Sequence, residues 1–415
     1  MTESRLTQDL ATVASPQGWS DPIGGAVLMT LALLTAVAPF GIDLYLPAFP
    51  VMKAELSTTA TGVQLSLTAF LIGAAIGQVI FGPWSDRAGR LKPLWVGLVV
   101  FLAASVTTIL TSSIELLVAA RLLQGIGGAA GMVIGRAIIL DYVRDAAAAR
   151  ALSLVMLITG VVPVVAPLVG GLLVDLIGWR GLLGIVGAVG LVAAVATVLF
   201  LRESLPPEVR LARAQARGSG SAWKSLLTRG YLGYAIAGGF GMAIMMAYIS
   251  ASPFVYQAMI GLSSVAYGLA FAANAIGLTL ATALSARLVR RFSMRFLVAA
   301  GLLISLAATL AILAMASSNV SAAWLMAPLF LSIAPLGLVF GNATALALSA
   351  VPQPSVGAAS ALLGMLQFAL AGIVAGLVGV AGEKSVVPLG LTMLAAAVVA
   401  LFGLVLAGRV APARA

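Results

Sequence analysis

The sequence predicts an all-α integral membrane protein with twelve membrane-spanning helices in two bundles of six. Of its 415 residues, 61% are hydrophobic and 9% are charged, and the mean hydropathy is +1.13. Soluble domains carry about 25% charged residues, so an aqueous globular protein is excluded. Apolar segments of about 20 residues, the length that crosses a bilayer, recur along the chain. The longest polar break separates two sets of six such segments.

The expected spans lie near 24–47, 60–82, 93–111, 116–140, 151–175, 180–201, 231–255, 264–286, 296–316, 322–349, 357–381 and 386–408. The chain therefore divides into an N-terminal segment (1–23), a six-helix bundle (24–201), a linker (202–229), a second six-helix bundle (230–408) and a tail (409–415).

Basic residues fall on one side of the predicted membrane. With both termini in the cytoplasm, 18 of the 23 Lys and Arg residues lie in cytoplasmic segments and three lie outside. Cytoplasmic loops of membrane proteins are enriched in Lys and Arg, so we expect this orientation and a cytoplasmic linker. The same bias accounts for the net charge of +10. A nucleic-acid partner is therefore not expected.

The two halves repeat at an offset of 200 residues. Residues 75–77 and 275–277 both read Ala-Ile-Gly, and Arg87 and Arg90 match arginines 200 residues later. Asp86 corresponds to Ala286, so the second copy lacks the acid. Parallel repeats of six helices are one way in which secondary transporters are built.

The chain contains neither cysteine nor histidine. This excludes disulfides, thiolate-metal sites and the commonest proton-transferring side chain. We expect no metal, no cofactor and no enzymatic activity, because the buried polar residues include no nucleophile–base pair. Any protons that this protein handles must be carried by carboxylates.

Asp43 and Arg121 are the main candidates for chemistry within the spans, where ionisable groups are costly. Each lies about five residues inside the outer end of its span, roughly 7 Å deep at 1.5 Å per residue, so the two side chains could meet. Burial favours a neutral carboxyl, whereas a nearby guanidinium favours the charged form. Such a pair can act as a proton switch. The alternative for Asp43 is an acid that merely caps the helix.

Three sequence patterns carry a family resemblance. Residues 82–92 read G-x-x-x-D-R-x-G-R-x-K, and residues 117–129 read L-x-x-x-R-x-x-Q-G-x-G-x-A. Both resemble signatures of the major facilitator superfamily of secondary transporters, the second one linked to proton coupling. Residues 43–50, D-x-Y-L-P-x-x-P, are similar to the helix 1 signature of its bicyclomycin/chloramphenicol-resistance (Bcr/CflA) branch of drug:proton antiporters.

The resemblance implies further roles. A cytoplasmic latch between conformations would comprise Asp86, Arg87, Gly89, Arg90, Arg136 and Asp141. In the family, the acid of this loop faces the start of helix 11, here near 355–357. These arginines could alternatively serve only to orient the chain.

An antiporter-type motif G-P-x-x-G-G in helix 5 is matched by Pro163, Pro167, Gly170 and Gly171, with Ala166 in place of one glycine. Ordinary helix packing could also account for it.

Candidates for the substrate cavity are polar, aromatic or methionine side chains inside the spans, and helix packing explains any one of them equally well. They are Tyr45, Gln124, Met242, Met245, Met246, Tyr248, Phe271, Asn274, Asn342, Gln367 and Phe368.

The resemblance implies a proton-coupled exporter of drugs or antibiotics, monomeric, in the bacterial inner membrane, that binds a small molecule and uses the proton gradient without a cofactor. Two rivals stay open. One is a proton-coupled exporter or symporter of a metabolite with the same fold. The other is a non-transporting sensor or scaffold, which would not need a buried Asp–Arg pair.

Overall fold

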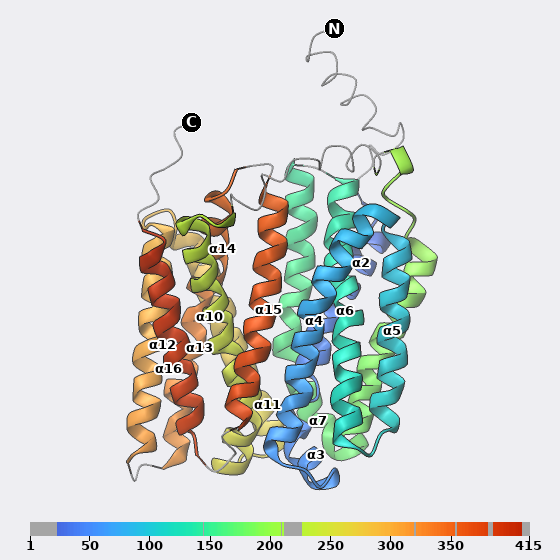
Figure 1. Cartoon of the computed structure of the whole chain (residues 1–415). Coiled ribbons are helices and arrows are strands. Elements are labelled where there is room, and N and C mark those ends of the chain that lie inside the picture. The colour runs from blue at the N-terminus through green and yellow to red at the C-terminus, as the bar shows by residue number, and fades with distance from the viewer. Residues whose placement is uncertain are drawn as a thin grey trace.

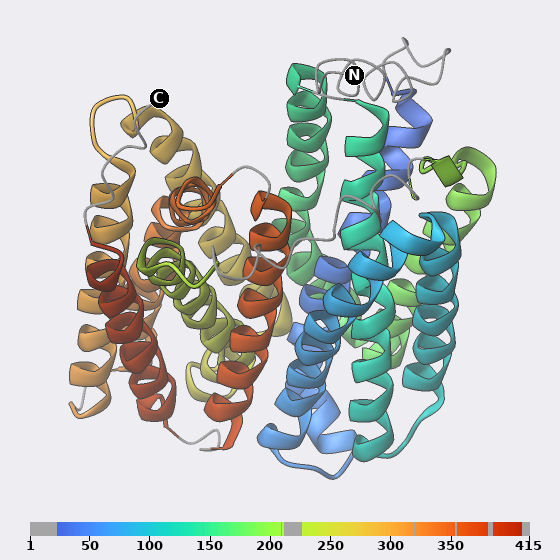
Figure 2. The ribbon, with the colours of Figure 1, turned by 45° about the horizontal axis from the view of Figure 1, so that its top comes forward.

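The structure is a computed structural model that describes residues 23–143, 145–208, 210, 226–318, 321–352, 355–380 and 385–408. These residues form helices and connecting turns, and no strand occurs among them. Figures 1 and 2 show two helical bundles side by side, with all helices running roughly along one common axis. The predicted all-α class with two helical bundles is confirmed. The N-terminal segment, most of the linker and the tail lie outside the described residues.

The first bundle is built from α2 (Gly25–Asp43), η1 (Leu46–Ala48), α3 (Phe49–Glu55), α4 (Ala60–Ala88), α5 (Leu91–Leu110), α6 (Ile114–Tyr142) and α7 (Asp145–Phe200). Hydroxyl side chains begin two of these helices. Thr59 accepts a hydrogen bond from the Gly62 amide, and Ser113 accepts one from the Leu116 amide. Such caps satisfy amides that have no partner within the helix.

The second bundle is built from α10 (Arg229–Pro253), η2 (Phe254–Met259), α11 (Ser264–Leu288), α12 (Met294–Ala316), η3 (Ala322–Leu325), α13 (Met326–Ile333), η4 (Ala334–Leu338), α14 (Phe340–Ser349), α15 (Val356–Val380) and α16 (Val387–Leu406). Thr228, Ser263 and Ser293 cap α10, α11 and α12 in the same way.

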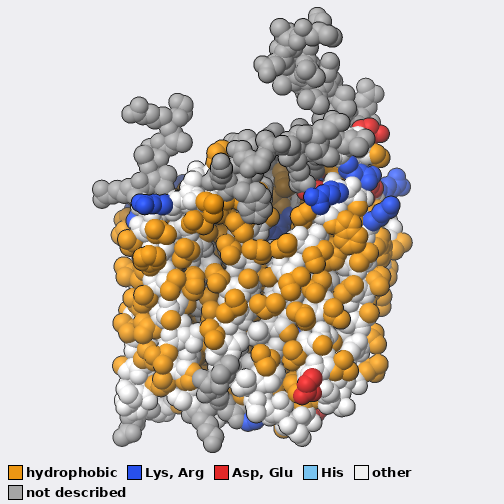
Figure 3. Space-filling view, in the orientation of Figure 1, with side chains coloured by type: hydrophobic (Ala, Val, Ile, Leu, Met, Phe, Trp, Pro, Cys, Tyr) orange, Lys and Arg blue, Asp and Glu red, His pale blue; other side chains and the backbone are white. Residues whose placement is uncertain are grey.

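Eleven segments among the described residues are long and apolar enough to cross a membrane. The longest, Arg150–Phe200, has 51 residues, which is more than twice what a bilayer core of about 30 Å requires. Its helix is broken at Gly178, where φ is +65°. The break divides it into two segments that each have spanning length. Exposed apolar side chains cover the middle of the face shown in Figure 3, as expected for a surface that faces lipid.

We call the end of the molecule that carries the 88–91 and 288–294 turns the basic end, and the other end the opposite end. Three hydrogen bonds join the two bundles at the opposite end. Thr61 Oγ1 donates to the Gly379 carbonyl, Gln64 Nε2 to the Ser250 carbonyl and Gln257 Nε2 to the Pro47 carbonyl, at 2.5, 2.9 and 3.1 Å. Towards the basic end α4 and α15 diverge, and Figure 3 shows the surface hollowed there. The molecule is closed at the opposite end and open at the basic end.

Candidate functional site

Asp43 lies where the first membrane helix breaks. Helix α2 ends at this residue, and the turn η1 follows with Pro47 near its start. Proline lacks the amide hydrogen that would continue the helical bonding, so the D-x-Y-L-P-x-x-P pattern produces a discontinuous helix. Asp43 is 3% exposed, and its Oδ1 has no hydrogen-bond partner among the described residues. A buried carboxyl at a helix break is a typical position for an ion-binding group in a transporter.

Arg121 is fully buried about two turns from the start of α6. Its guanidinium lies between two aromatic rings, 4.5 Å from the centre of the Tyr45 ring and 4.3 Å from that of Phe70. It donates hydrogen bonds to the Gly41 carbonyl, at 2.6 Å, and to the side-chain oxygen of Gln124. Gln124 in turn donates to Ser105 on α5, at 2.8 Å. The cation is thus held by two rings and two oxygen acceptors rather than by a carboxylate.

The expected meeting of Asp43 and Arg121 does not take the form of an ion pair. The Arg121 guanidinium bonds to the backbone two residues before Asp43, and no ion pair joins the two side chains in the described structure. The reason lies in the helix break, because the last carbonyls of a helix have no intrahelical partner. The Gly41 carbonyl is one of these, and it accepts the guanidinium instead. Arg121 is thus linked to the helix end that carries Asp43 through the backbone of Gly41.

We use the name buried polar cluster for Tyr45, Ser66, Ser105, Arg121 and Gln124. The Tyr45 hydroxyl lies 3.1 Å from the Ser66 hydroxyl on α4, so the cluster joins α2, α4, α5 and α6. Gly125 permits this arrangement, since a Cβ at that position would lie 2.1 Å from the Phe70 carbonyl oxygen. Close approach of α4 to α6 places the Phe70 ring on Arg121. Gly125 of the 117–129 pattern therefore helps to position the arginine.

The helix 5 glycines lie at two tight contacts. A Cβ on Gly170 would lie 2.0 Å from the Leu44 carbonyl, and one on Gly171 would lie 2.4 Å from the Ser264 carbonyl of the second bundle. Pro163 and Pro167 lie within the same helix, α7. The motif thus packs against the turn after Asp43 on one side and against the other bundle on the other.

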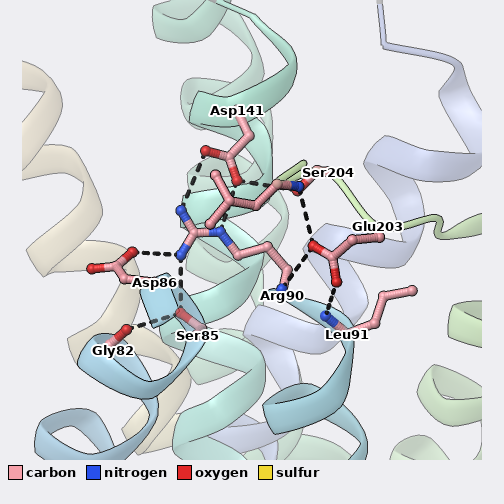
Figure 4. A network of polar contacts seen from close by, with 9 residues as sticks. Gly82, Ser85, Asp86, Arg90, Leu91, Asp141, Glu203 and Ser204 are labelled. Atoms are coloured by element: carbon pink, nitrogen blue, oxygen red, sulfur yellow. Dashed lines mark hydrogen bonds and ion pairs between the residues drawn. The ribbon is translucent and has the colours of Figure 1, made fainter. Parts of the chain in front are cut away.

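A second polar group, the loop network, surrounds Arg90 at the basic end (Figure 4). The Arg90 guanidinium contacts Asp141 on α6 through Nε at 2.7 Å and Nη2 at 3.2 Å, and contacts Asp86 through Nη1 at 2.7 Å. Nη1 also donates to the Ser85 hydroxyl. Burial of the guanidinium opposes its charge, but the hydrogen bonds and charges of Asp141 and Asp86 outweigh it and raise the pKa of Arg90. Arg90 is therefore a permanent cation that joins α4 to α6.

Glu203, which the sequence patterns did not single out, completes the loop network. Its two carboxylate oxygens accept hydrogen bonds from the backbone amides of Arg90, at 2.8 Å, and Leu91, at 3.1 Å (Figure 4). It thereby caps the start of α5, where an anion is favoured. Gly89 makes room for it, because its φ is +90° and a Cβ there would lie 2.7 Å from Glu203 Oε2. One sequence feature could have identified Glu203: it is an acid that directly follows a predicted span and begins an arginine-rich stretch.

Two of the expected latch residues lie apart from these contacts. Arg87 and Arg136 are exposed, and neither is hydrogen-bonded or ion-paired to another residue within the described part of the chain. Arg136 is on the same helix as Asp141, but the guanidinium that Asp141 holds is that of Arg90. The suggested contact of Asp86 with the start of α15 stays a prediction.

The cavity candidates divide into two groups. Met242, Met245, Gln367 and Phe368 are partly exposed. Tyr45, Gln124, Met246, Tyr248, Phe271, Asn274 and Asn342 are buried. Tyr45 and Gln124 belong to the buried polar cluster, and Asn342 donates to Ser285 on α11 at 2.8 Å. Tyr248 and Phe271 stack at 5.8 Å between ring centres. In this conformation the buried candidates pack the helices together.

Comparisons with known proteins agree with the architecture. The chain is 35% identical over 384 residues to a protein from Bacillus subtilis named uncharacterized MFS-type transporter YdgK, with 91% of this chain and 95% of that protein covered. It is 30% identical to a chloramphenicol resistance protein from Pseudomonas aeruginosa, with 87% and 84% covered. A bicyclomycin resistance protein homolog from Haemophilus influenzae is 28% identical, with 90% and 93% covered.

Among solved structures, the fold resembles that of a bacterial homolog of the human lysosomal transporter Spinster in an inward-facing, unoccupied conformation. The TM-score is 0.73 at 19% identity, with 94% of this chain and 97% of that chain covered. A D-xylose-proton symporter gives a TM-score of 0.71 at 16% identity, with 89% and 96% covered. The family model described as Major Facilitator Superfamily matches residues 31–376. The resemblance inferred from the sequence motifs is confirmed, and the chain belongs to the major facilitator superfamily of membrane transporters.

Proposed function

We propose that this protein is a proton-coupled exporter of drugs or antibiotics, with Asp43 as the proton carrier. The observation that carries the proposal is a carboxyl that is 3% exposed, has an oxygen without a partner and ends a membrane helix. The last turn of a helix disfavours an anion, and so does burial. Both effects favour protonated Asp43 in the conformation that is closed at the opposite end.

Arg121 supplies the opposing influence. Its guanidinium is fixed beside the end of α2 by the Gly41 carbonyl and by Gln124. If a drug and water enter through the open basic end, the cost of a charged carboxylate falls while the Arg121 cation remains. Asp43 would then release its proton towards the cytoplasm, and it would take up another when the opposite end opens. The chain contains no histidine that could take over this role.

Export from the cytoplasm requires that the open basic end face the cytoplasm, which is the orientation that the distribution of Lys and Arg favours. A drug would enter from the basic end and leave by the opposite end as a proton enters. The loop network around Arg90 would have to rearrange relative to the second bundle during this change. It would serve as the latch, and the carrier would be a monomer in the bacterial inner membrane.

Substrates of the phenicol and bicyclomycin type are the first to test, because relatives that cover most of the chain are named for resistance to chloramphenicol and bicyclomycin. Cells that lack their own efflux pumps would be made to express the chain, and their growth measured over a panel of antibiotics. Raised resistance supports export. If no antibiotic is tolerated better, the alternative is a proton-coupled exporter or symporter of a metabolite.

The proton carrier is tested by Asp43→Asn, which keeps the shape of the side chain and cannot ionise. Drug efflux from proteoliposomes driven by a proton gradient should be abolished, while equilibrium binding of chloramphenicol should persist because no apolar contact is lost. The matched control is Asp175→Asn, which changes an exposed acid on α7 and should retain efflux. Efflux by the Asp43→Asn protein that still follows the proton gradient would exclude Asp43 as the carrier.

A further inference from the structure

The turn between α11 and α12 concentrates positive charge at the basic end. Arg287, Arg290, Arg291 and Arg295 lie within nine residues, and we call them the basic patch. Arg287, Arg290 and Arg291 are exposed, and Arg295 is partly exposed. The turn itself is tight, since the Arg291 and Phe292 amides both donate to the Leu288 carbonyl at 2.9 Å. The fold therefore brings the backbone of these four arginines into one short turn.

The second half of the sequence offers these arginines no carboxylate. Between residues 230 and 415 the only acidic residue is Glu383, which lies outside the described residues. In sequence it falls between α15 and α16, whereas the basic patch falls between α11 and α12. In the first bundle the equivalent loop has Asp86, Asp141 and Glu203 around Arg90. The repeat has kept the cations and lost their counter-charges.

Neutral contacts replace the ionic ones in the second bundle. Ser85 contacts Arg90, whereas its counterpart Ser285 accepts a hydrogen bond from Asn342 at 2.8 Å. None of the four basic-patch arginines forms an ion pair within the described part of the chain. Nη1 of Arg295 is buried without a hydrogen-bond partner there. A guanidinium group with unused donors is suited to an oxyanion ligand.

Apolar side chains adjoin the basic patch. Phe292 and Phe296 are 45% and 53% exposed, and their rings stack at 5.3 Å between centres. In Figure 3 blue side chains lie over the start of α12 at the rim of the apolar surface without red neighbours in view. On the other side of the hollow, blue and red side chains are mixed. Cations above exposed rings at this depth match a surface that meets both a headgroup and the start of its acyl chains.

We propose that the basic patch is a binding site for an anionic phospholipid of the leaflet at the basic end. The phosphate would be bound by Arg290, Arg291 and the free donor of Arg295, and the acyl chains would lie against Phe292 and Phe296. Clusters of basic residues directly outside a membrane helix attract anionic lipids. Bound lipid would hold the basic end of the second bundle at the membrane surface while the first bundle moves relative to the second.

The test is titration of the purified full-length protein in detergent with phosphatidylglycerol and, separately, with phosphatidylcholine, with binding followed by native mass spectrometry. Each basic residue near an anionic surface contributes roughly a fivefold preference. The double variant Arg290→Gln/Arg291→Gln should therefore weaken phosphatidylglycerol binding by up to about 30-fold and leave phosphatidylcholine binding unchanged. The matched control is Lys92→Gln/Arg150→Gln, which removes two exposed cations elsewhere and should change neither.

A variant that adds an acid beside the basic patch provides an independent test of the lipid site. Ala286→Asp restores the acid at the spacing that brings Asp86 to 2.7 Å from Arg90, so it should also weaken phosphatidylglycerol binding. Equal losses in both double variants would mean diffuse attraction and would overturn the proposal, as would unchanged binding in Arg290→Gln/Arg291→Gln. If wild-type protein does not bind phosphatidylglycerol but the variant Glu3→Gln/Asp9→Asn/Asp21→Asn does, the chain's own N-terminal segment competes for the patch and the proposal is wrong.

Discussion

The contact of Gly171 with the second bundle provides a test of how the opposite end closes. Gly171 is on α7, and a Cβ there would lie 2.4 Å from the Ser264 carbonyl oxygen and 3.2 Å from the Val265 Cα at the start of α11. These are backbone atoms, which cannot turn away as a side chain can. The substitution Gly171→Ala therefore requires the two bundles to separate locally by roughly 1 Å to restore ordinary contact distances.

The cost falls on only one conformation. Overpacking a tight contact by one methyl group costs about 1–3 kcal/mol. When the opposite end is open, the two bundles are apart there and the added methyl group meets no such barrier. The equilibrium should consequently shift towards the open form by a factor of about 5 to 150. The higher helix propensity of alanine, about 1 kcal/mol, is the same in both conformations and cancels.

Distance measurements between the bundles can detect this shift. Spin labels on Ser112→Cys and Ser318→Cys, two exposed positions at the opposite end, would report the separation in the cysteine-free chain. Gly171→Ala should add a population at longer distance in double electron–electron resonance. The control is Gly160→Ala on the same helix, where an added Cβ has no neighbour within 4 Å. If both variants give the wild-type distance distribution, the contact does not control closure and the reasoning fails.

Two further predictions concern the stability of the loop network, measured by thermal unfolding in detergent. Arg90→Ala leaves the carboxylates of Asp86 and Asp141 without the cation that contacts both at 2.7 Å, and should cost about 3 kcal/mol, as removal of one member of a buried ion pair does; a loss below about 1 kcal/mol would show that solvent replaces the arginine. Glu203→Gln keeps one acceptor oxygen for the Arg90 and Leu91 amides and should cost about 1 kcal/mol, with Glu203→Ala costing more; equal stability of wild type and both variants would contradict the capping role.

The positions of the membrane helices follow from the sequence because bilayer thickness fixes their length. The expected span 60–82 corresponds to α4 (Ala60–Ala88), and 116–140 corresponds to α6 (Ile114–Tyr142). The predicted and observed helix ends differ at the basic end. A hydropathy pattern ends where charges begin, but the helix of α4 continues six residues beyond 82 and stops at Gly89, whose φ is +90°. Glycine, not charge, terminates the helix.

The partner of Arg121 could not be predicted from depth along a helix. Because Asp43 and Arg121 lie at similar depth, the sequence predicted that Arg121 would lie near the end of the first span. The hydrogen bond from Arg121 to the Gly41 carbonyl agrees with this position. Which atom accepts the guanidinium depends on a carbonyl freed by the break at Asp43 and on the ring of Phe70 from another helix. Glu203 was missed for a similar reason, since its contacts with residues 90 and 91 are more than 110 positions away in sequence.

In the second repeat, which has lost the acids, helix packing and contact with the membrane depend on different residues. In the first bundle Arg90 is neutralised within the protein, so its charges constrain α4 and α6 to one another and do not depend on the membrane. In the second bundle Asn342 and Ser285 make the equivalent helix contact without charge, and the arginines of the adjoining turn are left facing outward. Helix packing there is therefore independent of the arginines. Substitutions in the basic patch should alter lipid contact without disturbing the fold, whereas substitution of Arg90 must disturb both helix packing and any movement that uses the loop.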